Sequence, residues 1–256
     1  KILEEQRRIA EVLDRVDALR EKRRKAIALL DDLAQSIFLD MFENPNGKTG
    51  RWPSQPLGQV ASFYAGTTLP VGVSYSGQEG GYLLLKVGDL NLPENSEALQ
   101  AAREWSSHPG VRAATCPAGS VVIPKRGGAI ATNKKRISSR PCVLDPNLMA
   151  ISPHIDVLTV EYLYQWFKNF DLMSISNGSS VPQLNKKDLS PLNIPVPSID
   201  IQRTFGQALT SVSSQVARLQ NHLAQLDALF SSLQSRAFRG ELWHDEVNDL
   251  VGEAVS

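Results

Sequence analysis

The chain has 256 residues, of which 42% are hydrophobic and 21% are charged, and this composition is typical of a folded globular protein. The 27 Lys and Arg residues balance the 27 Asp and Glu residues, so the net charge neither indicates nor excludes a nucleic-acid partner. Cys116 and Cys142 are too few for a disulfide framework and lack a neighbouring His pair for zinc, so we expect buried free thiols in a reducing compartment. The apolar runs are too short to cross a bilayer, and the charged first residues are no signal peptide.

A long amphipathic helix is predicted for residues 1–42, which contain neither Gly nor Pro. Apolar residues recur there at heptad spacing, at Ile9, Val16, Leu30 and Ile37. Arg23 interrupts this seam. About 40 helical residues make a rod of about 60 Å, whose apolar stripe needs a partner.

A second long helix is predicted after residue 200, and it repeats the first. Its apolar residues are again seven apart, at Phe205, Val212, Leu219, Leu226 and Leu233. The pair Gln6-Arg7 aligns with Gln202-Arg203, an offset of 202 − 6 = 196 residues, and Phe42 then aligns with Phe238 without a gap. Because polar pairs match as well as the apolar phase, we interpret the two helices as an internal duplication.

Between the helices, residues 43–200 are richer in Gly and Pro and contain short β-prone runs. Strands are predicted at Gln59–Phe63, Tyr82–Val87, Ser120–Pro124, Val143–Leu144 and Met149–Ile151. A helix is predicted at residues 160–170, and Ser198 or Asp200 can cap the second long helix. We therefore expect an α+β fold: a mixed α/β domain inserted between two long helices that pair as an antiparallel coiled coil. The helices are assigned to 1–42 and 201–243, and residues 244–256 to a frayed acidic tail.

No catalytic or metal-binding motif is found in the sequence. It lacks the GxxxxGK[ST], HExxH and GxSxG patterns, its four His residues are scattered, and no pair of carboxylates suggests acid–base catalysis. We assign neither catalytic nor metal-binding residues.

A run of basic residues is the clearest functional signal. The segment KRGGAIATNKKRISSR, residues 125–140, holds six basic side chains and no acidic one. These are Lys125, Arg126, Lys134, Lys135, Arg136 and Arg140. Lys and Arg neutralise DNA phosphates, and glycines let backbone amides approach them, so the run is a candidate DNA contact that we expect at the surface. A solvated loop with a chance basic bias is the alternative.

A second polar stretch covers residues 176–188. Its candidate contacts to base edges or phosphates are Asn177, Ser179, Ser180, Gln183, Asn185, Lys186 and Lys187. Amides and hydroxyls can read base edges, and lysines bind phosphates. The two stretches together favour DNA binding over a solvated surface.

The chain resembles the specificity subunits of Type I restriction–modification systems. The resemblance rests on the order of short segments along nearly the whole chain: the first helix, FLDMFENP, LGQVASFYAGTT, YLLLKVGDLN, PAGSVVIPKRGGAIA, SSVPQLNKKDLSPLNIPVPSIDIQR and AFRGEL. It implies the C-terminal half of such a subunit: the central conserved helix, the second target-recognition domain and the distal conserved helix. The first recognition domain would belong to a longer chain, as the absent initiator Met suggests, or would come from a second copy in a homodimer.

The resemblance also implies a function. The chain would be a non-catalytic subunit that reads one half of a bipartite target in double-stranded DNA and docks methyltransferase subunits, with a restriction or translocase subunit as a further partner. It would need no cofactor itself, because S-adenosylmethionine would bind the methyltransferase. We expect a cytoplasmic prokaryotic protein without membrane contact. Two other functions stay open: a coiled-coil adaptor whose inserted domain binds protein, and a stand-alone enzyme.

Overall fold

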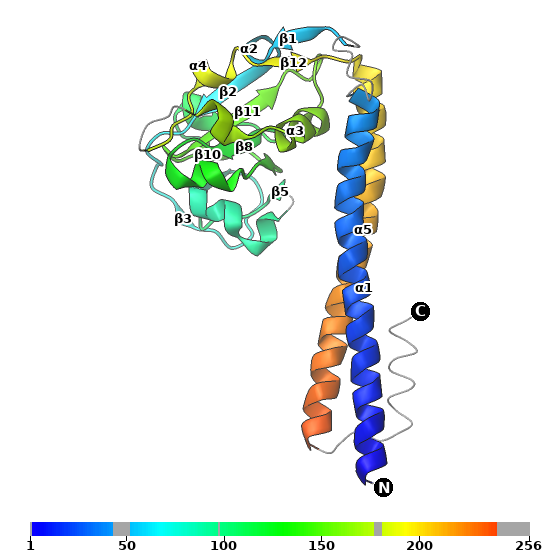
Figure 1. Ribbon diagram of the computed structural model, residues 1–256. Coiled ribbons are helices and arrows are strands. Elements are labelled where there is room, and N and C mark those ends of the chain that lie inside the picture. Colours follow the sequence, from blue (N-terminus) through cyan, green and yellow to red (C-terminus); the bar gives the residue numbers. More distant parts are fainter. Residues whose placement is uncertain (1, 43–51, 97, 177–180, 240–256) are drawn as a thin grey trace. The chain divides into compact units, whose positions relative to one another are not determined.

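The computed structural model describes residues 2–42, 52–96, 98–176 and 181–239 (Figure 1). It divides into two compact units. The helical unit comprises the chain up to Ile37 and from Gln207 onward, and the globular domain comprises Phe38–Gly206. In the part of the chain that the structure describes, no helix combines the length and apolar character needed to cross a membrane.

The helical unit is an antiparallel pair of long helices, α1 (Ile2–Phe42) and α5 (Ile199–Arg239), as Figure 1 shows. Val16, Leu226 and Leu233 are buried between them, and apolar neighbours such as Ile9 pack around this core. The predicted α+β fold class, with two long helices paired around an inserted domain, is confirmed.

Polar contacts add to the apolar seam of the helical unit. Arg20 Nε donates to Asp227 Oδ1 at 2.5 Å, and its guanidinium lies 4.5 Å from the centre of the Phe230 ring. Arg23, which interrupts the heptad repeat, has a buried Nε that makes no hydrogen bond within the described residues. Leu29 and Leu33 are exposed on α1. The seam is therefore closely packed around Val16 and more polar near Arg23.

The globular domain is built on two five-stranded sheets and one small ribbon. The first sheet has the order β2 (Ala61–Ala65), β11 (Leu148–Pro153), β8 (Val121–Pro124), β9 (Arg136–Ser138), β5 (Ala98–Leu99). The second has the order β3 (Val73–Ser74), β6 (Glu104–Ser106), β4 (Tyr82–Leu85), β10 (Cys142–Leu144), β7 (Thr115–Cys116). Strands β1 (Ser54–Pro56) and β12 (Asn193–Pro195) form the ribbon.

One apolar core joins the two sheets. Its buried side chains come from strands of both sheets and include Leu83, Leu85, Cys142, Val122 and Ala150. Residues at alternate positions of β4 point into this core, as the period of two in a strand requires. The core fixes the ends of the strands from which the loops of the domain emerge.

Short helices cover the sheets and connect the strands. The α-helices of the domain are α2 (Leu57–Val60), α3 (Val160–Lys168) and α4 (Lys186–Leu189). The 3-10 turns are η1 (Val87–Asn91), η2 (Pro93–Asn95), η3 (Arg112–Ala114), η4 (Gly127–Thr132) and η5 (Leu172–Ile175). Helix α3 begins after Thr159, whose side chain accepts a hydrogen bond from Tyr162 N. It buries Leu163 and Phe167 on its apolar face.

An aromatic cluster holds the two points where the chain enters and leaves the domain. The rings of Phe42 and Phe205 lie 5.3 Å apart, and Phe42 lies 4.7 Å from Tyr162. Gln202, fully buried, donates to the carbonyls of Val157 and Pro197, both at 2.9 Å. The end of α1 and the start of α5 are therefore side by side.

Most predicted strands are present, with shifted ends. The predicted strand Gln59–Phe63 is wrong in its first half: residues 57–60 form α2, and β2 begins at Ala61. The cause is pairing with a distant segment, because Leu57 N donates to Leu192 O and Gly58 N to Ser190 O. The predicted helix at 160–170 ends at Lys168. The tail at 244–256 lies outside the described residues.

Candidate nucleic-acid interface

Three strands of the first sheet terminate at the same edge of the domain. Ala65 pairs with Met149, and Leu148 pairs with Pro124, so β2 and β8 end where β11 begins. Gly66 N donates to Leu148 O at 3.0 Å, and Lys125 N donates to Asn147 O at 2.8 Å. Four segments meet here, and we call them the sheet-end surface: residues 66–72, 125–132, 145–147 and 181–187.

Lys125 is the most enclosed cation of the sheet-end surface. The residue is 8% exposed. Burial and the neighbouring Arg126 charge lower the pKa of Lys125, and the Asp145 carboxylate partly opposes this shift. An ammonium at the end of β8 is a donor suited to a phosphate or a base edge.

The segment that follows Lys125 is paired with the second polar stretch. Leu184 N donates to Lys125 O, Gly127 N donates to Pro182 O, and Arg126 forms a β-bridge with Gln183. The Arg126 side chain is exposed. These contacts, between residues 55 to 59 positions apart in the sequence, bring the two stretches together.

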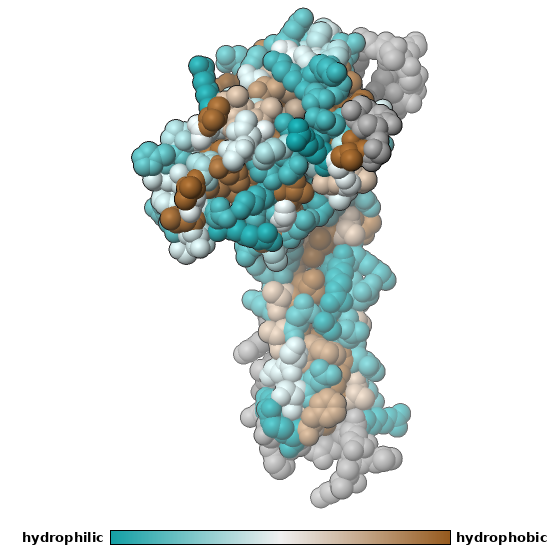
Figure 2. Space-filling model, turned by 90° about the vertical axis from the view of Figure 1, so that its left-hand side faces the viewer, coloured by the Kyte–Doolittle hydropathy of each residue, from teal (hydrophilic) through white to brown (hydrophobic). Residues whose placement is uncertain are grey.

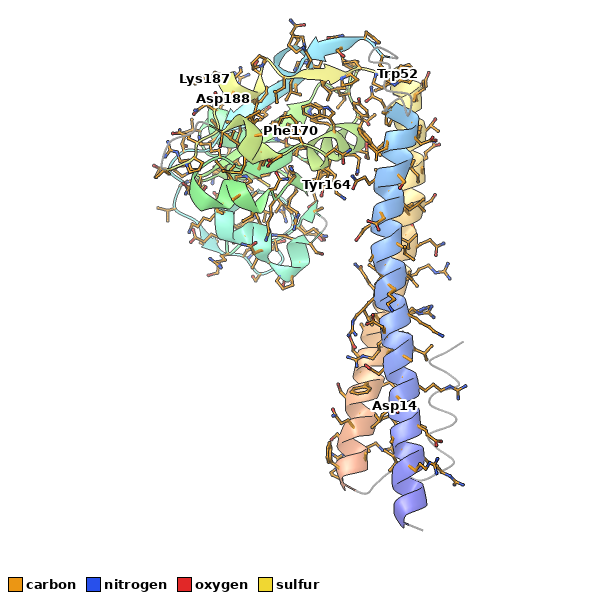
Figure 3. The ribbon with its side chains drawn as sticks, in the orientation of Figure 1. Asp14, Trp52, Tyr164, Phe170, Lys187 and Asp188 are labelled. Atoms are coloured by element: carbon orange, nitrogen blue, oxygen red, sulfur yellow. The ribbon has the colours of Figure 1, made fainter. Side chains whose placement is uncertain are left out.

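Helix α4 follows directly and adds two more cations. Asn185 caps the helix in a reciprocal arrangement with Asp188, and Gln183 donates to Asn185 at 3.2 Å. Asn185 therefore has a structural role. Lys186 and Lys187 are exposed on α4, whose Lys187 and Asp188 are labelled in Figure 3.

The remaining basic residues of the run are tied to the protein itself. Lys135 is 4% exposed and donates to Phe170 O at 2.6 Å, so the expectation that this charge lies at the surface is wrong. Burial lowers the pKa of Lys135 to about 8. Arg136 donates to the carbonyls of Asn95 and Lys135, and Lys134 donates to Asn91. These side chains hold the turns around β9 in place.

Arg140 lies at the opposite end of β9 from the sheet-end surface. Strand β9 is antiparallel to β8, with Val121 paired to Ile137, so the chain has returned along the sheet before it reaches Arg140. Its guanidinium donates to Tyr75 Oη, Gln78 O and Gly80 O. The basic run is therefore split between two ends of the domain.

Asn177, Ser179 and Ser180 lie outside the described residues. Of the thirteen candidate residues, the structure brings together Lys125, Arg126, Gln183, Asn185, Lys186 and Lys187. No residue of the loop 66–72 is among the thirteen candidates, although residues 64–68 are the alternative place for base readout if the second polar stretch does not read bases. In Figure 2, which faces the side of the domain that carries α4 and β3, hydrophilic residues are interspersed with separate hydrophobic patches.

The two cysteines face each other inside the domain. Cys116 on β7 and Cys142 on β10 are register partners, and both are buried free thiols, as expected. The hydrogen bond with the Cys116 thiol and burial both raise the pKa of Cys142. Across the described ranges, no group of three or more His, Cys, Asp or Glu side chains could hold a metal ion.

Comparisons with known proteins show that the chain is similar to specificity subunits. Residues 112–228 match the family described as "Type I restriction modification DNA specificity domain". The Type I restriction enzyme EcoDI specificity subunit of Escherichia coli is 30% identical over 105 residues, 37% of this chain and 24% of that protein. The EcoBI specificity subunit of the same organism is 30% identical over 112 residues, 40% of this chain and 24% of that protein.

Solved structures share the fold over most of the chain. A chain from "Structural basis underlying complex assembly and conformational transition of the type I R-M system" has a TM-score of 0.64 at 23% identity, covering 94% of this chain and 61% of that chain. The HsdS subunit from Thermoanaerobacter tengcongensis has a TM-score of 0.53 at 25% identity, covering 93% and 59%. The matched region thus spans about a quarter of the curated relatives' length and about three fifths of the solved chains. The resemblance expected from the sequence is confirmed.

Proposed function

We propose that this chain, which carries a Type I restriction–modification DNA specificity domain, is a non-catalytic recognition subunit that reads one half of a bipartite DNA target. The observation that supports this most is the sheet-end surface. It gathers Lys125 and Arg126 at the end of β8 with Lys186 and Lys187 of α4, beside three paired strands that fix the backbone. Cations on a rigid scaffold can position a duplex by its phosphates, while neighbouring polar groups read base edges.

Asn177, Ser179, Ser180 and Gln183 are proposed as base-reading residues within this interface. They belong to the segment that leads into α4, and Gln183 pairs with Arg126 through the backbone. Because amide and hydroxyl groups discriminate between base edges, changes here alter the preferred sequence more than the total affinity. The phosphate-binding lysines behave in the opposite way.

A bipartite target requires a second recognition domain, and the repeated helices support one. Phe42 is 5% exposed in the aromatic cluster, whereas its repeat equivalent Phe238 is 86% exposed. In a longer chain or a pair of copies, a second domain can cover the exposed position. The helical unit then sets the distance between the two half-sites.

The helical unit is also the proposed docking site for methyltransferase subunits. Leu29 and Leu33 are 67% and 44% exposed, and they lie four residues apart on one face of α1. S-adenosylmethionine and the methyl-transfer chemistry belong to those subunits, and a restriction or translocase subunit joins the same assembly. Such a complex acts on DNA in the prokaryotic cytoplasm.

The salt dependence of duplex binding tests the function. We compare the wild type with the double variant Arg126→Glu/Lys186→Glu and with the matched control Lys22→Glu/Arg218→Glu, whose residues are exposed on α1 and α5. Each lost phosphate contact lowers the slope of log affinity against log salt by about 0.9. The first variant loses affinity and slope, while the control binds as the wild type does. Binding that is absent or insensitive to salt in the wild type would instead indicate a protein-binding adaptor.

A further inference from the structure

We infer that Cys116 and Cys142 form a redox-sensitive modification site, a thiol pair that a peroxide converts into a disulfide across strands β7 and β10. This inference is independent of the proposed function, because neither its argument nor its test involves a bound duplex. The chain has only these two cysteines, so an intramolecular disulfide has one possible pairing. In a reducing compartment the pair stays a dithiol, as the structure describes it.

The register of the second sheet sets the two cysteines directly opposite each other. Strands β7 and β10 are antiparallel, and Cys142 is the register partner of Cys116. Directly opposite residues of an antiparallel pair have Cα atoms about 4.5–5.5 Å apart, within the range of about 4.4–6.8 Å that disulfides span. The two thiols already share a hydrogen bond. A bond between the sulfurs therefore requires side-chain rotation and no rearrangement of the strands.

The backbone is held on both sides of the pair. Strand β10 lies between β4 and β7, and Leu83 N donates to Pro141 O at 3.2 Å. After β7, the Ser120 and Ser138 hydroxyls donate to Pro117 O at 2.8 and 3.0 Å. These contacts keep the two sulfurs together in the folded protein, so the step that joins them is intramolecular and favoured by proximity.

The two thiols differ in how readily they lose a proton. The hydrogen bond with the Cys142 thiol lowers the pKa of Cys116 against the opposing effect of burial, and the Ser120 hydroxyl adds to the lowering. The same hydrogen bond and burial raise the pKa of Cys142, whose thiol also donates to Arg140 O at 3.1 Å. Because the thiolate is the reactive form, Cys116 is the nucleophile and Cys142 the resolving thiol.

Cys116 lies on an edge strand, where local opening costs least. Strand β7 is the outermost strand of the second sheet and has two residues. Pro117 follows it and has no backbone N–H to extend the ladder. Both cysteines are fully buried, so the oxidant must be small and must enter through a local opening of β7. Hydrogen peroxide meets this requirement.

The oxidation proceeds in two steps. The Cys116 thiolate attacks one oxygen of hydrogen peroxide, the O–O bond breaks, and the products are Cys116 sulfenic acid and hydroxide, which takes up the proton that Cys116 released. Cys142 Sγ then attacks the sulfenic sulfur, the S–S bond forms and the S–O bond breaks. The departing hydroxide leaves as water with the Cys142 proton. In total, two thiols lose two electrons and two protons, and one peroxide becomes two waters.

The disulfide would close a loop that contains the basic run. Residues 117–141 include β8, η4 and β9, and with them all six basic side chains of residues 125–140. A cross-link between residues 142 − 116 = 26 positions apart restricts the unfolded chain, so we expect oxidation to raise the urea midpoint by about 1–2 M. The competing interpretation is an inert pair, because both cysteines belong to the apolar core with Leu83 and Leu144.

The test treats the folded full chain with hydrogen peroxide and then blocks the remaining thiols with iodoacetamide in denaturant. We expect both thiols to be lost, with an intact mass lower by two hydrogens and a peptide that links Cys116 to Cys142. A dithiol reductant restores both thiols. Thiols that stay free in the folded protein, that react only in urea, or that cross-link two chains on a non-reducing gel would overturn the inference.

Single variants separate the roles of the two thiols. In Cys142→Ser, the Cys116 sulfenic acid has no resolving thiol, so dimedone should trap it. In Cys116→Ser, trapping at Cys142 should be at least about tenfold slower, because Cys142 keeps its proton. Equal trapping in the two variants would overturn the assignment of Cys116 as the nucleophile.

The double variant Cys116→Ala/Cys142→Ala is the matched control for stability. Peroxide also oxidises methionines, of which the chain has three, and the control reports that effect alone. Circular dichroism establishes that the control is folded. We expect the urea midpoint to rise on oxidation in the wild type and not in the control. A midpoint that falls equally in both would show that the disulfide does not stabilise the domain.

Discussion

Phe42 and Phe238 occupy equivalent positions of the repeated helix, 196 residues apart, yet Phe42 is 5% exposed and Phe238 is 86% exposed. Phe42 packs against Tyr162 and Phe205, with ring centres 4.7 and 5.3 Å away. One copy of the repeated phenylalanine is therefore packed in the globular domain, and the other is on the surface. In an assembly with a second recognition domain, that domain would cover Phe238 as this one covers Phe42.

Alanine at the two positions should have unequal effects on stability. Phe42→Ala removes a ring from a packed aromatic cluster and should lower the free energy of unfolding by about 3–5 kcal/mol. Phe238→Ala should change it by less than about 0.5 kcal/mol, as surface changes do. Urea unfolding followed by circular dichroism measures both. Equal losses would show that Phe238 is packed in solution.

Lys135 should make the stability depend on pH in the alkaline range. Its pKa is lowered from the usual 10.5 to about 8, so between these pH values the unfolded chain binds more protons than the folded chain. The free energy of unfolding therefore rises with pH across this window, by about 1.4 kcal/mol per unit of pKa difference, or about 3 kcal/mol.

Lys135→Met serves as the reference for this measurement, because subtracting its pH profile cancels all other titrations. Denaturant midpoints at pH values from 7 to about 11 cover the window. A difference profile that is flat, or that falls with pH, would show that the ammonium of Lys135 is not desolvated in the folded protein.

Lys125 and Arg140 should respond oppositely to removal of their charge. Lys125→Met keeps the buried stem but should lower duplex affinity about tenfold, the value of a charged hydrogen bond. Arg140→Met loses its bonds to Tyr75 at 3.1 Å and to Gln78 at 2.7 Å, so it should lower stability by about 1–3 kcal/mol with little effect on the affinity of the folded protein. Fluorescence anisotropy and urea titration separate the two effects. The reverse pattern would place the DNA at the other end of β9.

The long helices could be predicted from the sequence, but the shortest strands could not. The long helices were predictable because heptad spacing and repetition extend over about 40 residues, and burial of Val16 and Leu226 follows from that spacing. The strands β3, β5 and β7 have two residues each, too few to establish a period. Their positions depend on the partners to which they pair.

The candidate site was predictable only in part, for a related reason. A count of charges along residues 125–140 cannot reveal that β8 and β9 fold back on each other, which separates Arg126 from Arg140. It also cannot distinguish an exposed lysine such as Lys186 from Lys135, which is 4% exposed and bonded to Phe170 O. The pairing of Arg126 with Gln183 is a long-range contact that no local motif predicts.

A longer helical unit should change the spacer of the target and not its half-sites. One heptad inserted between Arg24 and Lys25, with a matching heptad beside Asp227, which Arg24 contacts at 3.7 Å, preserves the seam. Seven residues lengthen the rod by about 10 Å, or about three base pairs of DNA. Sequencing of the sites methylated by the assembled complex measures the spacer. Methylation at the original spacing would mean that the helices serve assembly alone.

Hydrogen–deuterium exchange of the full chain, free and bound to its best-selected duplex, tests the DNA-binding surface most directly. Slower exchange on binding is predicted for peptides that cover residues 66–72, 125–132 and 181–189, because these segments form the sheet-end surface and α4. Peptides around Gln78 and Arg140, at the opposite end of β9, should exchange at the same rate in both states. Protection around Arg140 with none in the three predicted segments would contradict the account.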